Sequence, residues 1–352
     1  GPMEDNYNKK KRICKKMEII SEGKHFRLLP ENELPKLLDY LEQFLPESLK
    51  FHQTVKTYLN DKIWHFYFYV SKNYPEDPIV LHFPGCTHTP NKNMYESFGI
   101  FCPTKRIELV DLMETEDVLI NWKKPLYLNF THKAIMDRLN LFYSARGGIM
   151  HRLEGDIYVY KKLNNELELE PLPSDEVEMR PLNVENVQGI HDLYPASEIE
   201  CVEVFEKLVQ VLPGVGIFRK NTNELAAWMV HSYYGAMFSM QTKPQYRRKG
   251  YGIHLAKTLT QKVIERGYLP FVVIRPENDA SRSLYRKLGF EKVYETVRAT
   301  FMPHEENGQA DSQNDEGIED MLAEKCAITN GKKAEDSKDE GIDENCKDDQ
   351  NA

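Results

Sequence analysis

The segment from Leu225 to Phe290 constrains the fold of this chain more than any other. Its pattern predicts two strands, a basic turn with two glycines, a helix, an apolar strand and a second helix. A helix between two strands forms a crossover that brings the second strand back parallel to the first. The carboxyl ends of both strands then meet at one edge of the sheet, where ligands commonly bind. The sequence therefore predicts an α+β domain with a ligand site at that edge.

The basic turn before the first helix has the composition of a phosphate-binding loop. Gly250 and Gly252 allow a ligand to approach the backbone without a Cβ in the way. The N–H groups at the helix start, together with the positive end of the helix dipole, attract an anion. Four cations lie around the glycines: Lys243, Arg247, Arg248 and Lys249. Taken alone, the same pattern is also typical of an ordinary helix start with solvated lysines.

Three polar residues follow the turn after one crossover. Asn278 comes 28 residues after Gly250, and Ser281 and Tyr285 follow it on the second helix. The crossover would bring Asn278 and Tyr285 to the same crevice as the phosphate loop. A phenol, with an ordinary pKa of about 10, can protonate a departing thiolate if a cation or helix start lowers its pKa. On the helix alone, this role and core packing beside Leu284 are equally compatible with Tyr285.

Polar and charged segments divide the chain into five parts. We expect a basic leader (1–24, with Gly1-Pro2 as a tag scar), a first domain (25–165), a linker (166–176), a second domain (177–302) and an acidic tail (303–352). The tail carries 16 acidic residues against 5 lysines and has no aromatic residue. Leader and tail bury too little apolar surface to offset the entropy of ordering, so we expect both to be disordered.

Hydrophobic periodicity predicts the secondary structure of both domains. In the first domain, leucines at helical spacing from Leu34 to Leu45 predict a helix, and the runs 63–70 and 79–81 predict strands. In the second domain, strands are expected at 177–182, 214–220, 225–233, 236–242 and 269–274, with two final strands within 290–301. Helices are expected at 184–194, entered through Asn183, and at 199–212, 249–266 and 279–288, the last ending at Gly289.

Composition excludes several classes of protein. The tail has a net charge of −11 and the whole chain −9, so the other residues carry about +2. A nucleic-acid-binding protein would need a strongly basic face, so this class is excluded. No run approaches 18 apolar residues, so no membrane span is expected. The six cysteines are scattered without a C-x-x-C pair. This predicts neither a metal site nor a disulfide framework, and favours a reducing, cytoplasmic compartment.

The second half of the chain resembles the GNAT superfamily of acyl-CoA N-acyltransferases. Arg247-x-x-Gly250-x-Gly252 is similar to the acyl-CoA loop of that superfamily, and Asn278 to Phe290 is similar to its "N…A…LY…LGF" helix. Other stretches narrow the resemblance. Leu45 to Lys50 and Leu119 to Lys123 resemble the glycine N-acyltransferase family, and Leu212 to Gly216 with the Trp228 strand are similar to FR47-like members of the same group. The resemblance covers about residues 25–301. It also leaves a mitochondrial location open, although the leader carries Glu4, Asp5 and Glu18, which a transit peptide should lack.

The resemblance implies two GNAT-like domains in tandem, each a mixed, mostly antiparallel sheet flanked by helices. The first would be degenerate and the second would carry the acyl-CoA site. The implied activity moves an acyl group from acetyl-CoA or a longer acyl-CoA to a small amine such as glycine or another amino acid, without a covalent enzyme intermediate. Tyr285 would protonate the coenzyme A thiolate. The implied acyl-CoA-binding residues are Gln241, Thr242, Arg247, Arg248, Lys249, Gly250, Tyr251, Gly252, Asn278 and Ser281.

One position departs from this pattern. Glycine-acylating relatives carry a glutamate base on the strand before the phosphate loop, and the matching position here is Ala236. His231 and Tyr233 are the nearest titratable side chains by sequence. Two alternatives therefore stay open: an acyl-CoA-binding protein without turnover, and a peptide or protein N-acetyltransferase.

Overall fold

The computed structural model describes residues 19–63, 65–84, 96–162, 167–195 and 202–304. These residues form two compact units. Unit 1 holds the described residues up to Glu154 and those from Tyr294 onward, and unit 2 holds those from Gly155 to Val293. The segments 1–18 and 305–352, which include most of the expected leader and tail, lie outside the described residues. No helix in the described part is both long and apolar enough to span a bilayer.

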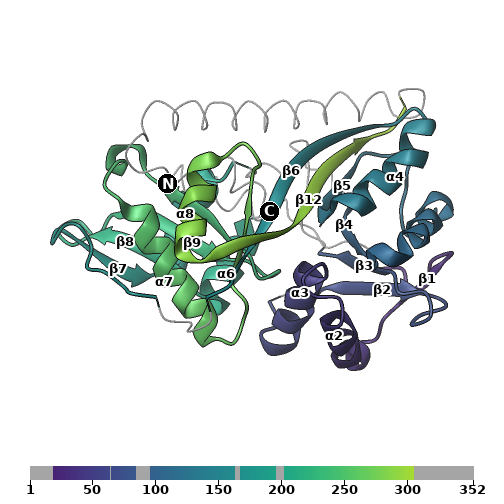
Figure 1. Cartoon of the computed structure of the whole chain (residues 1–352), viewed down its shortest axis with the longest axis horizontal. Coiled ribbons are helices and arrows are strands. Elements are labelled where there is room, and N and C mark those ends of the chain that lie inside the picture. The colour runs from purple at the N-terminus through teal and green to yellow at the C-terminus, as the bar shows by residue number, and fades with distance from the viewer. Residues whose placement is uncertain (1–18, 64, 85–95, 163–166, 196–201, 305–352) are drawn as a thin grey trace. The chain divides into compact units, whose positions relative to one another are not determined.

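One succession of strands and helices occurs twice along the chain (Figure 1). The first repeat contains β1 (Phe26–Leu28), η1 (Glu31–Glu33), α2 (Leu34–Glu42), α3 (Leu49–Asn60), β2 (Tyr67–Ser71), β3 (Val80–Phe83), β4 (Glu96–Phe101), η2 (Thr104–Thr115), β5 (Leu126–His132), α4 (Lys133–Ala145) and β6 (Ile149–Tyr160). The second repeat contains β7 (Val177–Pro181), η3 (Val184–Asn186), α5 (Val187–Leu193), α6 (Val202–Val211), β8 (Gly214–Arg219), β9 (Leu225–His231), β10 (Met237–Thr242), η4 (Pro244–Tyr246), α7 (Tyr251–Glu265), β11 (Phe271–Ile274), α8 (Asp279–Leu288) and β12 (Phe290–Met302).

The sheets are mixed and mostly antiparallel, with helices packed on them. In unit 1 the strand order is β1-β2-β3-β4-β5-β12, and of these pairs β4 with β5 is parallel. In unit 2, β10-β9-β8-β7 is antiparallel throughout, and β11 pairs antiparallel with β6. The expected architecture, two α+β units that each have a mixed, mostly antiparallel sheet flanked by helices, is confirmed.

The last strand of each repeat pairs with the other repeat. Strand β12 pairs with β5, with Phe301 opposite Leu126, and β6 pairs with β11, with Val159 opposite Phe271. The boundary between the two compact units falls inside β6, between Glu154 and Gly155, and the domain bounds expected from the sequence, with a linker at 166–176, stay a prediction.

The two final strands expected within 290–301 were a wrong prediction. Residues 290–302 form one strand, β12. They contain no glycine, proline, asparagine or aspartate, so no residue favours a turn that would divide the strand.

Helix ends in the second repeat follow local chemistry. Asn183 Oδ1 accepts from the N–H of Glu185, and the Asn183 N–H donates to Asn186 Oδ1, a reciprocal cap at the start of η3. Gly289 ends α8 with φ +103°, a left-handed conformation that glycine adopts without strain. Both ends lie where the sequence predicted them.

In the first repeat, the observed ends of two elements differ from the predicted ones. Helix α2 ends at Glu42, so Leu34, Leu37 and Leu41 are buried whereas Leu45 is 39% exposed. Strand β2 begins at Tyr67, after the start predicted at Ile63.

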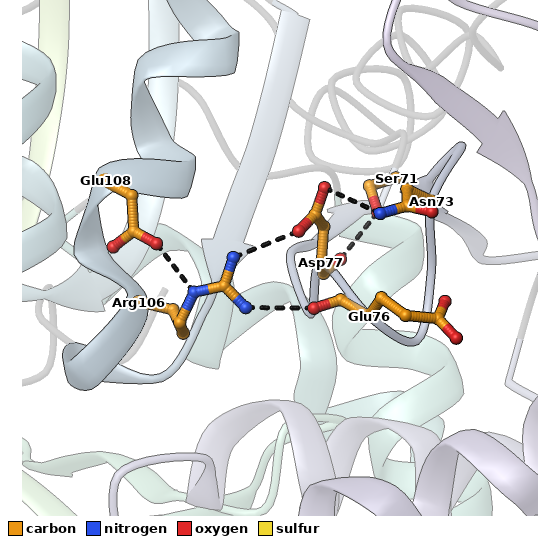
Figure 2. A network of polar contacts seen from close by, with 6 residues as sticks. All are labelled: Ser71, Asn73, Glu76, Asp77, Arg106 and Glu108. Carbon is orange, nitrogen blue, oxygen red and sulfur yellow. Dashed lines mark hydrogen bonds and ion pairs between the residues drawn. The ribbon is translucent and has the colours of Figure 1, made fainter.

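A polar network ties the β2–β3 turn of unit 1 to the start of η2 (Figure 2). The Arg106 guanidinium donates to Asp77 Oδ1 at 3.0 Å, to the Glu76 carbonyl at 2.9 Å and to Glu108 Oε1 at 2.6 Å. Ser71 Oγ donates to the Asp77 carbonyl at 2.6 Å. One planar cation therefore fixes the turn and the helix start together.

Each unit has its own apolar core. In unit 1, Trp122 packs against Phe98, Phe142, Tyr143 and Phe301. In unit 2, α7 packs on β8, β9 and β10. The buried face of α7 carries Leu255, Ala256, Leu259 and Val263 at helical spacing.

Candidate functional site

The candidate site lies in unit 2, along the edge of strand β10. On one side β10 pairs with β9, where Thr242 is opposite Ala227. On the other side, the pairing with β11 in the described part is one parallel bridge, between Ala236 and Phe271. Along its other edge β11 pairs with β6, and no further pairing of β10 with β11 follows this bridge in the described residues, so the two strands part there. An edge strand presents a row of N–H and C=O groups to which an extended molecule can add.

A β-bulge in β10 explains why the two strands part. The register of β10 against β9 shifts between Phe238 and Gln241, and Ser239 adopts φ +56°. A bulge bends its strand and increases the local twist, which turns β10 away from β11. Sequence analysis missed this bulge. A buried serine in the left-handed region has no residue signature, because glycine is the usual residue there.

The turn after β10 leads into α7 through two left-handed residues. Arg248 has φ +63° and Gly250 has φ +73°. Gly250 is the N-cap of α7 and has no side chain to bond the first N–H groups of the helix. A Cβ built on Gly250 would meet no atom within 4 Å, so the space beside it is open. A left-handed turn running into a helix start directs backbone N–H groups toward an anion.

Polar contacts hold this turn in place. Tyr246 donates its hydroxyl to Glu224 Oε2 at 2.5 Å, which lowers the pKa of Glu224, and Lys243 lies 3.5 Å from Glu224 Oε1. The Arg247 Nε–H donates to the Thr242 carbonyl at 3.3 Å. Arg248 and Lys249 are exposed. The sequence predicted the cations, but not Glu224, whose contact with Tyr246 spans a long sequence separation.

Helix α8 begins at the same edge as α7. The parallel bridge at Ala236 sets β10 and β11 in one direction, so both carboxyl ends, and the helices that follow them, start on the same side. Asn278 Oδ1 accepts from the Ser281 N–H at 3.1 Å and caps α8. Ser281 is fully buried, and its hydroxyl has no hydrogen-bond partner among the described residues. A ligand that reached this hydroxyl would satisfy a buried polar group.

Tyr285 lies on the buried face of α8. It is 1% exposed, and its ring packs edge-on against Phe290 with 5.2 Å between centroids. Leu284 and Leu288 belong to the same core cluster, together with Tyr251 of α7. Successive residues of a helix project about 100° apart, so Tyr285 need not share the buried face of Leu284. In the structure the buried face of α8 is broad enough to include both residues.

The side chains considered as a base lie near the β9–β10 turn. Ala236 is fully buried at the point where β10 and β11 part. His231 is 1% exposed, and its Nε2 lies 2.9 Å from the Gly235 carbonyl, to which the neutral ring donates. Burial lowers the pKa of His231 to about 4. Tyr233 packs its ring against Tyr234. A histidine with this pKa and this burial is a weak proton acceptor for an ammonium group.

His231 should make the stability of the fold depend on pH. Its pKa is about 4 in the folded chain and near the ordinary 6.5 in the unfolded chain, so protons favour unfolding. The stabilisation is present above pH 6.5 and is lost as the pH falls toward 4, by at most about 3 kcal/mol. His231→Gln should show a shallower decline than wild type in denaturant unfolding measured across this range. Parallel declines for the two proteins would mean that His231 titrates normally.

The corresponding region of unit 1 has a different construction. Strands β4 and β5 pair in parallel at three successive positions, from Glu96 opposite Leu126 to Phe98 opposite Leu128. The following helix, η2, begins after Pro103 and has no glycine at its start. The described residues of unit 1 therefore show neither the parting of strands nor the open helix start found in unit 2.

No group of three or more His, Cys, Asp or Glu side chains within the described ranges is arranged to hold a metal ion.

Part of this chain matches a known protein family, and its fold is similar to solved structures. Residues 214–299, from β8 into β12, match the model of the family described as FR47-like protein. A search of curated protein sequences finds no significant match. The chain is similar to the X-ray structure of a Drosophila protein from structural genomics, with 20% identity, a TM-score of 0.68, and coverage of 79% of this chain and 98% of that chain.

Two further solved structures are more distantly similar. One is a GCN5-related N-acetyltransferase from Sphaerobacter thermophilus, with 11% identity, a TM-score of 0.47, and coverage of 78% of this chain and 94% of that one. The other is a tandem GNAT protein from the clavulanic acid biosynthesis pathway, with 11% identity, a TM-score of 0.47, and coverage of 79% and 98%.

Proposed function

We propose that the chain is an acyl-CoA-dependent N-acyltransferase with a tandem GNAT fold, because residues 214–299 match the FR47-like family and one succession of strands and helices occurs twice. The observation that supports this most directly is the parting of β10 and β11 at Ala236, beside an α7 start opened by Gly250. Acyl-CoA is an extended donor with amides at one end and a pyrophosphate at the other. The edge strand can bond the amides, and the open helix N-terminus at the same sheet edge can bind the pyrophosphate.

We assign the donor-binding roles as follows. The backbone of β10 at Gln241 and Thr242 would bond the pantetheine amides as an added strand. The N–H groups at the start of α7 would bind the pyrophosphate, with added attraction from nearby cations. Asn278 and Ser281 would lie toward the pantetheine or adenosine. The pyrophosphate residues are Arg247, Arg248, Lys249, Gly250, Tyr251 and Gly252.

The proposed reaction is direct attack of a neutral amine on the thioester carbonyl of acetyl-CoA or a longer acyl-CoA. The amine nitrogen bonds the carbonyl carbon, the nitrogen releases one proton to water, the carbon–sulfur bond breaks, and the coenzyme A thiolate takes up a proton. Tyr285 would supply that proton. We propose a small acceptor such as glycine or another amino acid, in the cytoplasm.

One observation favours a second candidate, an acyl-CoA-binding protein without turnover. Ala236 occupies the position that the resemblance assigns to the base, and the pKa of the neighbouring His231 is lowered to about 4. Without a base, the enzyme would depend on ordered water or on the small neutral fraction of the amine.

A thiol-release assay separates the two candidates. The purified chain would be incubated with acyl-CoAs of increasing chain length and a panel of amino acids and simple amines. The enzyme hypothesis expects coenzyme A release that depends on the amine and rises with pH, because the neutral amine fraction rises. Acyl-CoA binding without amine-dependent release at any pH would support the non-catalytic candidate.

A further inference from the structure

Unit 1 contains a cavity that takes no part in the proposed acyl transfer. Its volume is about 760 Å³, within the range of small-molecule sites in proteins. The residues that line it include Lys24, Asp117, Trp122, Lys123, Tyr143 and Arg146. They come from the N-terminal segment, the loop between η2 and β5, and the end of α4. The cavity is therefore built entirely from residues of unit 1.

A buried carboxylate holds the walls of this cavity in place. Glu116 is fully buried and accepts four backbone N–H groups, from Lys24, His25, Val118 and Leu119, at 2.8 to 3.2 Å. The Glu116 carbonyl accepts from the Trp122 indole at 2.9 Å. The loop that carries Asp117 to Lys123 is therefore anchored to the N-terminal segment, and the cavity is preorganised for a ligand.

Tyr143, one of the residues that line the cavity, carries a buried hydroxyl. The residue is 2% exposed, and its hydroxyl has no hydrogen-bond partner among the described residues. Burial raises the pKa of Tyr143 well above its usual range, so the phenol remains protonated. A buried hydroxyl without a partner is costly, and a ligand that brings an acceptor oxygen would remove that cost.

The charges of the lining favour a singly charged anion. The lining includes the cations Lys24, Lys123 and Arg146, and Arg146 donates to the Glu114 carbonyl at 2.5 Å. With His304 neutral, these three cations and the two lining carboxylates, Glu114 and Asp117, leave one net positive charge. Apolar lining from Ile120, Trp122 and Pro303 suits a ligand with a hydrophobic body. Phosphate, which has no such body and more charge, is a poorer match.

We propose that this cavity binds a small organic monocarboxylate with an apolar body. The carboxylate would pair with the cations at Lys24, Lys123 and Arg146, and an acceptor oxygen of the ligand would take the Tyr143 hydrogen bond. The proposal does not depend on the acyltransferase activity, because it uses no residue of the acyl-CoA site.

The test uses calorimetric titration of the full chain with phenylacetate. Phenylacetamide, its neutral isostere, and inorganic phosphate serve as comparison probes. We expect phenylacetate to bind and both comparison probes to bind at least tenfold more weakly. Tyr143→Phe should lower the affinity for phenylacetate about tenfold. It should not lower the unfolding midpoint, because the hydroxyl makes no hydrogen bond in the unliganded chain. The double variant Lys24→Gln/Lys123→Gln should also lose binding.

Two control variants locate the probe. Tyr160→Phe removes another buried hydroxyl that has no partner among the described residues; Tyr160 is not one of the residues that line the cavity, so phenylacetate affinity should be unchanged. Gly250→Val, at the proposed acyl-CoA site, should also leave it unchanged. The proposal is overturned if phenylacetate and phenylacetamide bind equally, if neither binds at millimolar concentration, if the cavity variants keep wild-type affinity, or if Gly250→Val abolishes binding.

Discussion

Gly250→Val is expected to abolish the stabilisation of this protein by acyl-CoA. The space where a Cβ would lie is open, so a valine side chain would enter the region in which the pyrophosphate is proposed to bind. In wild type, acyl-CoA at 100 times its dissociation constant should stabilise the fold by about 2.7 kcal/mol, which is several degrees in the unfolding midpoint. Thermal unfolding with and without acetyl-CoA measures this difference directly.

The effect of valine on the backbone must be separated from its effect on the ligand. Gly250 has φ +73°, so valine there should also destabilise the unliganded fold, by about 1–2 kcal/mol. Gly267, just beyond the other end of α7, has φ +85° and equally open space around its Cβ position. Gly267→Val should therefore lower the unliganded midpoint similarly but keep the acyl-CoA shift. If wild type itself shows no shift at millimolar acyl-CoA, the donor assignment is wrong.

Tyr285→Phe is expected to reduce turnover by roughly 10²–10⁴-fold, the range typical for loss of a general acid. The substitution keeps the ring that packs against Phe290 and removes the proton donor, so folding and acyl-CoA affinity should change little. The loss should become smaller for a thioester whose leaving thiol has a lower pKa, because that thiolate needs less protonation. The rates of wild type and Tyr285→Phe, measured at saturating amine for a series of thioesters whose leaving thiols differ in pKa, test this expectation.

Tyr160 on β6 offers a matched control for Tyr285. Its ring also packs against Phe290, with 5.4 Å between centroids, and its hydroxyl is also buried. Tyr160→Phe should leave turnover unchanged. Full activity in Tyr285→Phe, combined with loss of acyl-CoA binding in Gly250→Val, would mean that Tyr285 only packs and that the proton comes from water.

The sequence by itself determined the features that depend on neighbouring residues. Asn183 and Asn278 cap their helices through bonds to N–H groups two or three residues away, and Gly289 ends α8 because its own backbone adopts a positive φ. The apolar stripe of α7 and the alternation of strands and helices likewise follow from local periodicity. These features are predictable because their causes lie within a few residues.

Tertiary structure alone decided which strands pair and where they part. The pairing of β12 with β5 joins Phe301 to Leu126, and the bridge of Ala236 with Phe271 marks where β10 and β11 separate. The burial of Tyr285 and the cavity around Tyr143 depend in the same way on residues distant in sequence. Apolar strands can pair in many ways, and the native pairing is the one that gives the best burial and register over the whole fold. A local sequence pattern does not contain this information.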